Sequence, residues 1–178
     1  MYIRRVSVMV KKLFGIDKPI IGALHFTPLL GFSGFNGFED ILKAAVSDAK
    51  AFESGGIDAI IIENNYDLPH RIMVEPETVA SMTYLGSEIK KKTKLRLGVS
   101  VLWNDYRAAF AIAKVIGAEF IRVPAFVDDA KTDFGTAIAE PEKVKDCRKR
   151  LSAEHVQIFA DLNSSNFNTT LTGNPVLL

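Results

Sequence analysis

The sequence contains a single cysteine, Cys147, among its 178 residues. A disulfide within one chain needs two thiols, so no disulfide framework holds this fold. A lone thiol is also typical of proteins in a reducing compartment. We therefore predict a cytoplasmic location, with Cys147 as a bystander on a helix.

Long hydrophobic runs are also absent. Apolar stretches such as Ala59–Ile62 have the length of a strand, whereas a membrane-spanning helix needs about 20 apolar residues. The sequence therefore predicts no transmembrane segment, and any place at a membrane would be peripheral.

Neither sign of charge is in excess. The chain carries 22 Lys and Arg against 21 Asp and Glu, a formal net charge of +1. Nucleic-acid binding by a broad basic surface is not expected from this balance. A hydrophobic content of 48% is enough for one buried core, so we expect a globular domain.

Acidic residues are missing from the first sixteen positions, which include Arg4, Arg5, Lys11 and Lys12. A basic, acid-poor start is typical of mitochondrial targeting segments, so a mitochondrial location is one alternative. The other interpretation, which we favour, is that residues 1–9 are an N-terminal extension preceding the folded domain.

Short apolar runs alternate five times with segments of helical spacing, the pattern of successive βα units in a parallel sheet. The strands are predicted at 20–26, 59–64, 95–102, 120–124 and 156–162. Helices are predicted at 38–52, 79–89 and about 105–116, with a fourth beginning near Pro141. The segment between strand four and the last helix is expected to be a long, solvated loop. Residues 163–178 are polar and have no helical period, so we assign them to a C-terminal tail.

Two architectures are compatible with five βα units: a doubly wound open sheet and an incomplete (β/α)8 barrel. Polar residues in the strands favour the barrel, because charged groups converge in the upper interior of a barrel, whereas strands covered on both faces are mostly apolar. Arg122 lies within strand four, and His25 lies near the end of strand one. We predict an α/β fold with an incomplete parallel TIM-type barrel at residues 10–162. Its open edges favour self-association or a partner chain.

The candidate site is formed by polar residues at the strand ends. His25 is a candidate general acid or base, with Glu63 and Asp161 as catalytic carboxylates. Arg122 needs a carboxylate partner if it is buried, and Glu63 and Asp161 are the obvious ones. Arg122, Asn64 and Asn104 are predicted to bind ligand.

Each of these assignments has a structural alternative. A buried polar layer would show the same residues, His25 could fix its own loop, and Asn104 or Asp105 could cap the following helix. His25, Glu63 and Asp161 would also suit a divalent ion, although their spacing does not require one, so no metal is assigned. Gly31, Gly34 and Gly37 lack the spacing of a dinucleotide-binding loop, and the cofactor stays unknown.

Eight blocks of sequence carry a further signal: KPIIGALHFTPL at 18–29, GGIDAIIIEN at 55–64, PETVASMT at 76–83, LGVSVLWND at 97–105, AIA at 111–113, GAEFIRV at 117–123, TDFG at 132–135 and IFAD at 158–161. In this order, and over about residues 10–162, the chain resembles the BtpA/SgcQ family.

The resemblance implies a TIM barrel of the ribulose-phosphate-binding type and a small phosphorylated or polar metabolite as ligand. Phosphate groups in such barrels are commonly held after strands seven and eight, beyond the five units found here, so impaired activity is expected. The best-known member of the family is associated with accumulation of photosystem I proteins at the thylakoid. The alternative function is therefore non-catalytic assembly of a membrane complex, such as photosystem I biogenesis, with the protein peripheral to the membrane.

Overall fold

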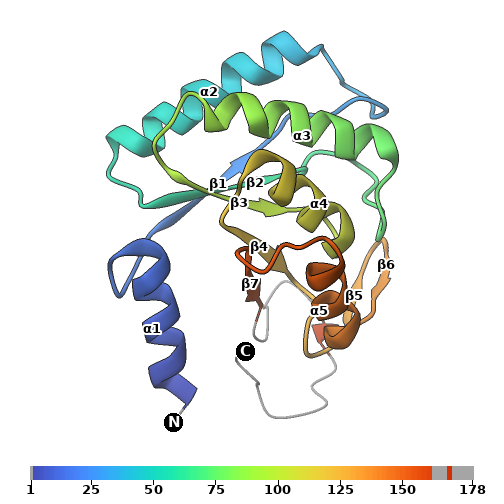
Figure 1. Cartoon of the computed structure of the whole chain (residues 1–178). Coiled ribbons are helices and arrows are strands. Elements are labelled where there is room, and N and C mark those ends of the chain that lie inside the picture. The colour runs from blue at the N-terminus through green and yellow to red at the C-terminus, as the bar shows by residue number, and fades with distance from the viewer. Residues whose placement is uncertain (1, 162–167, 170–178) are drawn as a thin grey trace.

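The computed structural model describes residues 2–161 and 168–169, with side chains from residue 8 to residue 161. Its centre is a parallel sheet in the order β1-β2-β3-β4-β7, so strands that follow one another as βα units are neighbours (Figure 1). This confirms the predicted barrel-type order, because a flavodoxin-like sheet would place β1 between its second and third strands. The strands are β1 (Ile21–His25), β2 (Ala59–Glu63), β3 (Arg96–Ser100), β4 (Phe120–Val123) and β7 (Gln157–Ala160).

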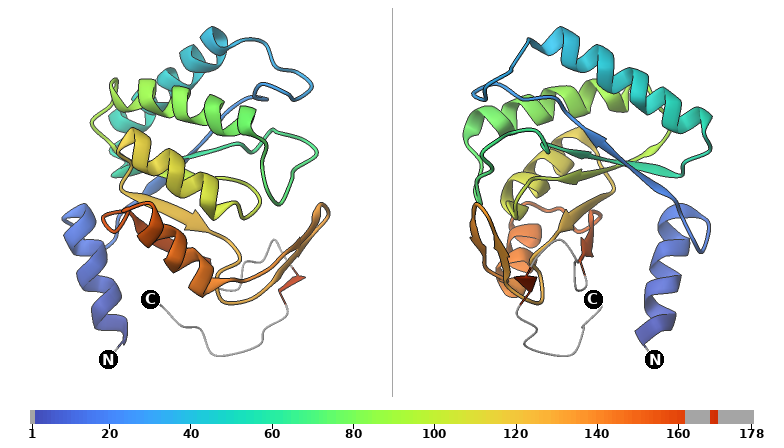
Figure 2. Two further views of the ribbon diagram at one scale, coloured as in Figure 1. Left: turned by 45° about the vertical axis from the view of Figure 1, so that its right-hand side comes forward. Right: turned by 180° about the vertical axis from the view of Figure 1, so that it is seen from behind.

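Four helices connect these strands and cover one face of the sheet, as Figures 1 and 2 show. Asp105 caps α4 by accepting a hydrogen bond from the Ala108 amide, and Gly117 ends that helix in the left-handed conformation, at φ 71°. Proline occupies the first turn of α3 and of α5, where its missing N–H has no helical partner. The helices are α2 (Phe38–Ser54), α3 (Pro76–Lys90), α4 (Tyr106–Ile116) and α5 (Pro141–Arg150).

The two faces of the sheet carry different side chains because successive residues of a strand alternate in direction. The outer face carries aliphatic residues such as Ile60, Ile62 and Val99, which form the main core with the four helices. The inner face has a smaller apolar cluster around Ala59, Ile61 and Phe120. Further along the strands the inner face becomes charged, and the candidate site lies there.

The N-terminal segment forms a helix, α1 (Tyr2–Phe14), which includes most of the residues 1–9 that the sequence assigns to an N-terminal extension. It lies apart from the other helices (Figures 1 and 2) and reaches the inner face through Phe14. The Phe14 ring centroid is 6.0 Å from that of Phe120 and 6.1 Å from that of Phe159. The apolar and basic residues of this segment alternate with helical spacing, a signal that our interpretation as an extension did not use.

The loop after β4 is also more ordered than predicted. It contains an antiparallel hairpin of β5 (Ala130–Thr132) and β6 (Gly135–Ala137), and β8 (Asn168–Thr169) pairs with β5. Ala125, Ala130 and Ala137 form a small core under this hairpin with Ile72 from the loop after β2. Apart from β8, the predicted tail at 163–178 lies outside the described residues.

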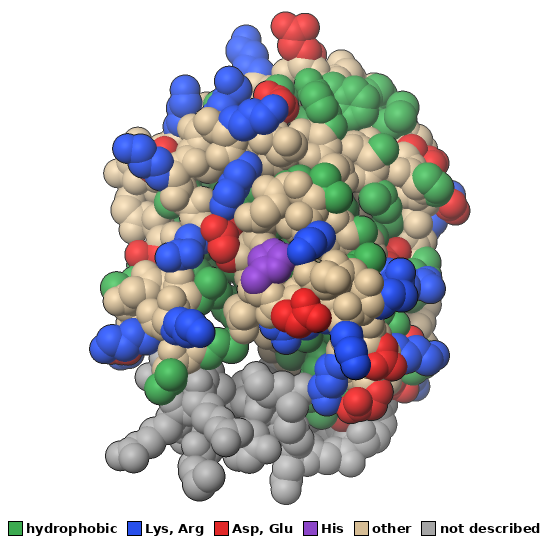
Figure 3. All heavy atoms as spheres, in the orientation of Figure 1, with side chains coloured by type: hydrophobic (Ala, Val, Ile, Leu, Met, Phe, Trp, Pro, Cys, Tyr) green, Lys and Arg blue, Asp and Glu red, His purple; other side chains and the backbone are tan. Residues whose placement is uncertain are grey.

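Two further features of the described residues are the length and apolarity of their helices and the distribution of charge on one face. Among the described residues, no helix is long and apolar enough to cross a bilayer. On the face shown in Figure 3, Lys and Arg side chains are interspersed with Asp and Glu.

Gly98 leaves room on the inner face for the Phe120 ring. A Cβ atom built at Gly98 would lie 2.1 Å from that ring, far inside van der Waals contact. We expect Gly98→Ala to lower the free energy of unfolding by about 1–3 kcal/mol through overpacking, measured by urea denaturation. The double variant Gly98→Ala/Phe120→Leu should cost less than the sum of the single changes, and strict additivity would contradict this account.

Candidate functional site

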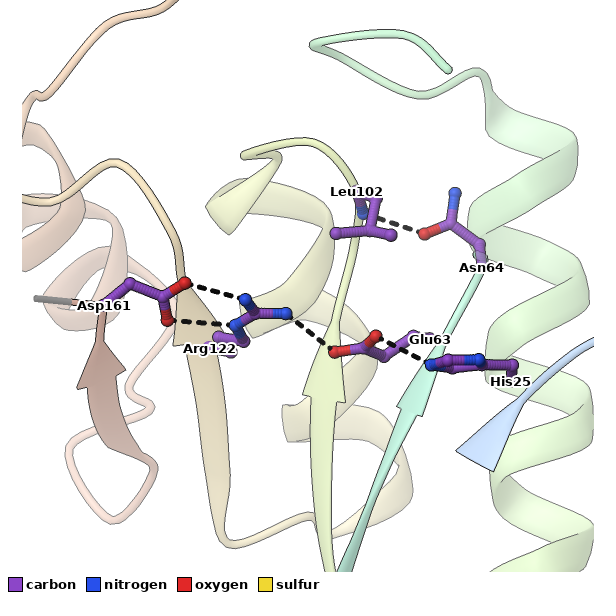
Figure 4. A network of polar contacts seen from close by, with 6 residues as sticks. All are labelled: His25, Glu63, Asn64, Leu102, Arg122 and Asp161. Carbon is purple, nitrogen blue, oxygen red and sulfur yellow. Dashed lines mark hydrogen bonds and ion pairs between the residues drawn. The ribbon is translucent and has the colours of Figure 1, made fainter. Parts of the chain in front are cut away.

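Four charged or titratable side chains form a row across the carboxyl ends of the strands (Figure 4). His25 and Glu63 are the last residues of β1 and β2 and are paired in register. Arg122 comes from β4, and Asp161 follows β7 directly. We call His25, Glu63, Arg122 and Asp161 the charged row. All four were predicted from the sequence, and the structure brings them together.

Arg122 is held by two carboxylates. Its Nε and Nη2 atoms donate hydrogen bonds to the two carboxylate oxygens of Asp161, at 3.0 and 2.7 Å. Its Nη1 atom donates to Oε1 of Glu63 at 3.2 Å. The hydrogen bonds with Asp161, followed by the attraction of both carboxylates, outweigh burial and raise the pKa of Arg122 above its ordinary value. The guanidinium is therefore charged at neutral pH.

His25 lies at the other end of the row. Its Nε2 atom is 3.3 Å from Oε2 of Glu63, so Glu63 contacts Arg122 with one oxygen and His25 with the other. The Glu63 side chain is 7% exposed, whereas the His25 side chain is 34% exposed. A shielded carboxylate thus orients an accessible imidazole, an arrangement that serves general acid or base chemistry.

Two small residues of β3 lie beneath this row. Ser100 is paired in register with Glu63, and Gly98 is paired with Phe120. Because β3 runs between β2 and β4, the Arg122 side chain has to cross β3 to reach Glu63. The Ser100 hydroxyl is fully buried and forms no hydrogen bond within the described residues. Our sequence interpretation gave Ser100 no role, although a small polar residue after apolar Leu97 and Val99 was a usable signal.

Asn64 and Asn104 hold loops together. Oδ1 of Asn64 accepts a hydrogen bond from the Leu102 amide at 2.8 Å, which joins the loops after β2 and β3. The side-chain amide of Asn104 exchanges two hydrogen bonds with the backbone of Ala125, at 3.0 and 3.1 Å, which joins the loops after β3 and β4. Both side chains are buried. This geometry favours positioning of the rim over direct contact with ligand, and the ligand-binding role stays a prediction.

Asp67 completes this set of contacts between loops and was not identified from the sequence. Its Oδ1 atom accepts a hydrogen bond from the Leu29 amide at 2.9 Å, which ties the loop after β1 to the loop after β2. Burial raises the pKa of the Asp67 carboxyl above its ordinary value, although the hydrogen bonds from Leu29 and Asn64 act in the opposite direction. Buried loop residues of this kind have no periodic signal in a sequence.

A metal centre receives no support from the arrangement of the row. No group of three or more His, Cys, Asp or Glu side chains converges as metal ligands among the described residues. His25 and Asp161 lie at opposite ends of the row, with the Arg122 guanidinium between Glu63 and Asp161. A cation at this place would face that positive charge.

Comparison with known proteins assigns the chain to a family. Residues 16–172 match the BtpA family. The chain belongs to this family. An uncharacterised protein of Pyrococcus horikoshii is 36% identical over 162 residues, which are 87% of this chain and 62% of that protein. The photosystem I biogenesis protein BtpA of Synechocystis is 32% identical over 169 residues, which are 89% of this chain and 58% of that protein.

The solved structures that resemble the chain confirm the TIM-barrel type of fold. The 7,8-dihydropteroate synthase of Vibrio fischeri superposes with a TM-score of 0.55 at 17% identity, over 80% of this chain and 44% of the enzyme. The dihydropteroate synthase of Xanthomonas albilineans superposes with a TM-score of 0.52 at 19% identity, over 76% of this chain and 42% of the enzyme. Both are TIM-barrel enzymes, and likeness at this level of identity concerns the fold alone.

The chain spans only part of the proteins that it matches, between 56% and 62% of the length of the first four curated relatives. The structure accordingly shows a five-stranded sector, whereas a closed barrel of this type has eight strands.

Asp161 should contribute more to stability than Glu63, because it accepts two hydrogen bonds from Arg122 and Glu63 accepts one. We expect Asp161→Asn to lower the free energy of unfolding by roughly 1–3 kcal/mol, between the values for exposed and fully buried ion pairs. Glu63→Gln should lower the free energy of unfolding by less, with both variants measured by urea denaturation. As a control, Glu142→Gln breaks an exposed pair with Lys145 and should have almost no effect. A larger loss of unfolding free energy for Glu63→Gln than for Asp161→Asn would contradict this prediction.

Asp67 should make stability depend on pH. Because its folded-state pKa lies above the unfolded value near 3.8, its contribution is present below that pH and is lost as the pH rises through the folded pKa. Asp67→Asn keeps an acceptor for the Leu29 amide and cannot ionise. The free energy of unfolding of this variant, relative to the unchanged protein, should therefore rise between about pH 4 and about pH 7. The same change at the exposed Asp48 should show no such trend, and a flat difference for Asp67→Asn would contradict the assignment.

Proposed function

We propose that the chain binds a small polar or phosphorylated metabolite at the charged row and that His25 acts there as a general acid or base. The observation that carries this proposal is the contact between His25 and Glu63 at the carboxyl ends of the strands. Barrel enzymes place their reacting groups at this end of the sheet, because the loops there can vary without disturbing the core.

The proposed roles follow from the contacts. With Nε2 of His25 facing Glu63, the second ring nitrogen is the one proposed to exchange a proton with the ligand. We propose that Glu63 orients the imidazole, as a carboxylate does in other acid and base pairs. Asp161 holds Arg122 with both oxygens, so we propose that it acts through Arg122 and not on the ligand directly. Asn64 and Asn104 keep the surrounding loops in place.

A second function, assembly of a membrane protein complex, is favoured by one observation: the Synechocystis relative is named for photosystem I biogenesis and is 32% identical to this chain. An assembly factor would act through its surface and would not need the acid and base pair. Sensitivity to changes in the charged row therefore separates the two functions.

The metabolite hypothesis is tested by screening sugar phosphates, organic acids and nitrogenous metabolites for a rise in melting temperature. For a compound that binds, we expect His25→Asn and Glu63→Gln to weaken binding at least about tenfold in calorimetry, the effect of losing one good polar contact. Glu88→Gln replaces a carboxylate by an amide in α3, outside the charged row, and should leave the affinity unchanged.

The opposite result would be equally clear. Affinity that is unaffected by both variants would place the ligand elsewhere. If no compound raises the melting temperature and the chain instead co-purifies with a membrane complex, the assembly function is favoured.

A further inference from the structure

We infer that the part of the ligand that meets the charged row is a planar ring bearing N–H donors, and that a phosphate group of the ligand does not bind to Arg122. This inference rests on the proposed function and names the ligand chemistry of the same site. Three properties of the row carry it: its charge, the direction of its hydrogen bonds, and the aromatic side chain beside it.

The charge of the row excludes it as a receptor for anions. Glu63 and Asp161 are two carboxylates against the single guanidinium of Arg122, so the formal charge is −1 with a neutral His25 and zero with a protonated one. No protonation state of His25 makes the row positive while both carboxylates are ionised. A phosphate dianion placed here would gain no net attraction.

The hydrogen bonds of Arg122 also argue against phosphate binding at the row. A guanidinium binds phosphate best through two parallel N–H groups, and the pair formed by Nε and Nη2 is already taken by Asp161. A third N–H group is bound by Glu63. Two of the five N–H groups of the guanidinium are left for a ligand, and contact through the Nε and Nη2 pair would require phosphate to displace Asp161.

The carboxylates, in contrast, have capacity for donors. A carboxylate has about four lone-pair positions. Oε1 of Glu63 contacts Arg122, and Oε2 contacts His25. The Asp161 side chain is 19% exposed and receives two bonds from Arg122. The row therefore offers a ligand unused acceptor positions on the carboxylates, the Asp161 side chain being more exposed than that of Glu63 at 7%, besides the two remaining N–H groups of Arg122.

An exposed aromatic residue lies next to these acceptors. Tyr66 is 50% exposed, and its ring centroid is 6.1 Å from that of His25, with the two planes at 79°. Leu68 in the same loop and Leu30 in the neighbouring loop are also exposed, and the hydrogen bond between Leu29 and Asp67 joins these loops. A flat ring can stack on an aromatic face of this kind while its edge donates to a carboxylate. Together these features match an amino-substituted nitrogen heterocycle.

The test uses three small probes with the full chain: 2-aminopyridine, pyridine and inorganic phosphate, titrated with ligand-observed NMR. The first two are planar rings of similar size, and only 2-aminopyridine carries an exocyclic amino donor. We expect 2-aminopyridine to bind about tenfold more tightly than pyridine, the difference made by one charge-assisted hydrogen bond, and phosphate not to bind at the row.

Variants locate the binding. Glu63→Gln and Tyr66→Ala should each weaken 2-aminopyridine binding severalfold, whereas the matched control Glu88→Gln should not change it. Melting temperatures show which variants are folded. Tyr66→Ala removes no ion pair of the row, so it carries the test alone if Glu63→Gln does not fold.

Three results would overturn the inference: no binding of 2-aminopyridine, equal binding of the two rings, or phosphate binding that Arg122→Gln abolishes. The last result would leave the proposed function standing, because a phosphorylated ligand would then bind through Arg122. The proposed function fails separately if His25→Asn and Glu63→Gln both leave the affinity for the metabolite unchanged.

Discussion

The central constraint on this structure is a guanidinium on the inner face of a parallel sheet. An arginine in that place is stable only when carboxylates surround it, since an unpaired charge in a partly enclosed position costs several kcal/mol. Asp161 and Glu63 meet that requirement from strands on either side of Arg122. Because the three residues come from β2, β4 and the end of β7, the contacts depend on strand order and register. The polar layer and the topology are therefore coupled.

The side chains of β3, the strand between these partners, have to be small on the inner face. Arg122 reaches Glu63 only by crossing β3, where Ser100 stands in register with Glu63. One layer further down, Gly98 leaves the space that the Phe120 ring fills. Larger side chains at these two positions would separate the charged partners or displace the aromatic cluster with Phe14. On the inner face, long side chains from the neighbouring strands β2 and β4 therefore lie over β3, whose residues there, Gly98 and Ser100, are small.

Strand order and the charged row could be predicted because both leave a strong local signal. Apolar runs alternate with helical periods, and a charged residue such as Arg122 within a strand demands a partner. The missed features depend on contacts between segments distant in sequence. Asp67 looks like an ordinary loop residue until Leu29, thirty-eight positions earlier, donates to it. The β5–β6 hairpin is stabilised by packing against Ile72, which no local period reveals. The helical spacing of α1 can be read locally, but its contacts through Phe14 with β4 and β7 cannot.

In the function that we propose, the ion pairs that stabilise the inner face also determine what it binds. Each N–H group of Arg122 that holds a carboxylate is unavailable to an anionic ligand, while each carboxylate keeps lone-pair positions beyond its contacts with Arg122. Stability and ligand chemistry therefore cannot be separated by changing Asp161 or Glu63 alone. Tyr66 is different, because it borders the row through its ring contact with His25 and takes part in none of the ion pairs. Its side chain is where recognition can change while the charged layer, and with it the fold, stays intact.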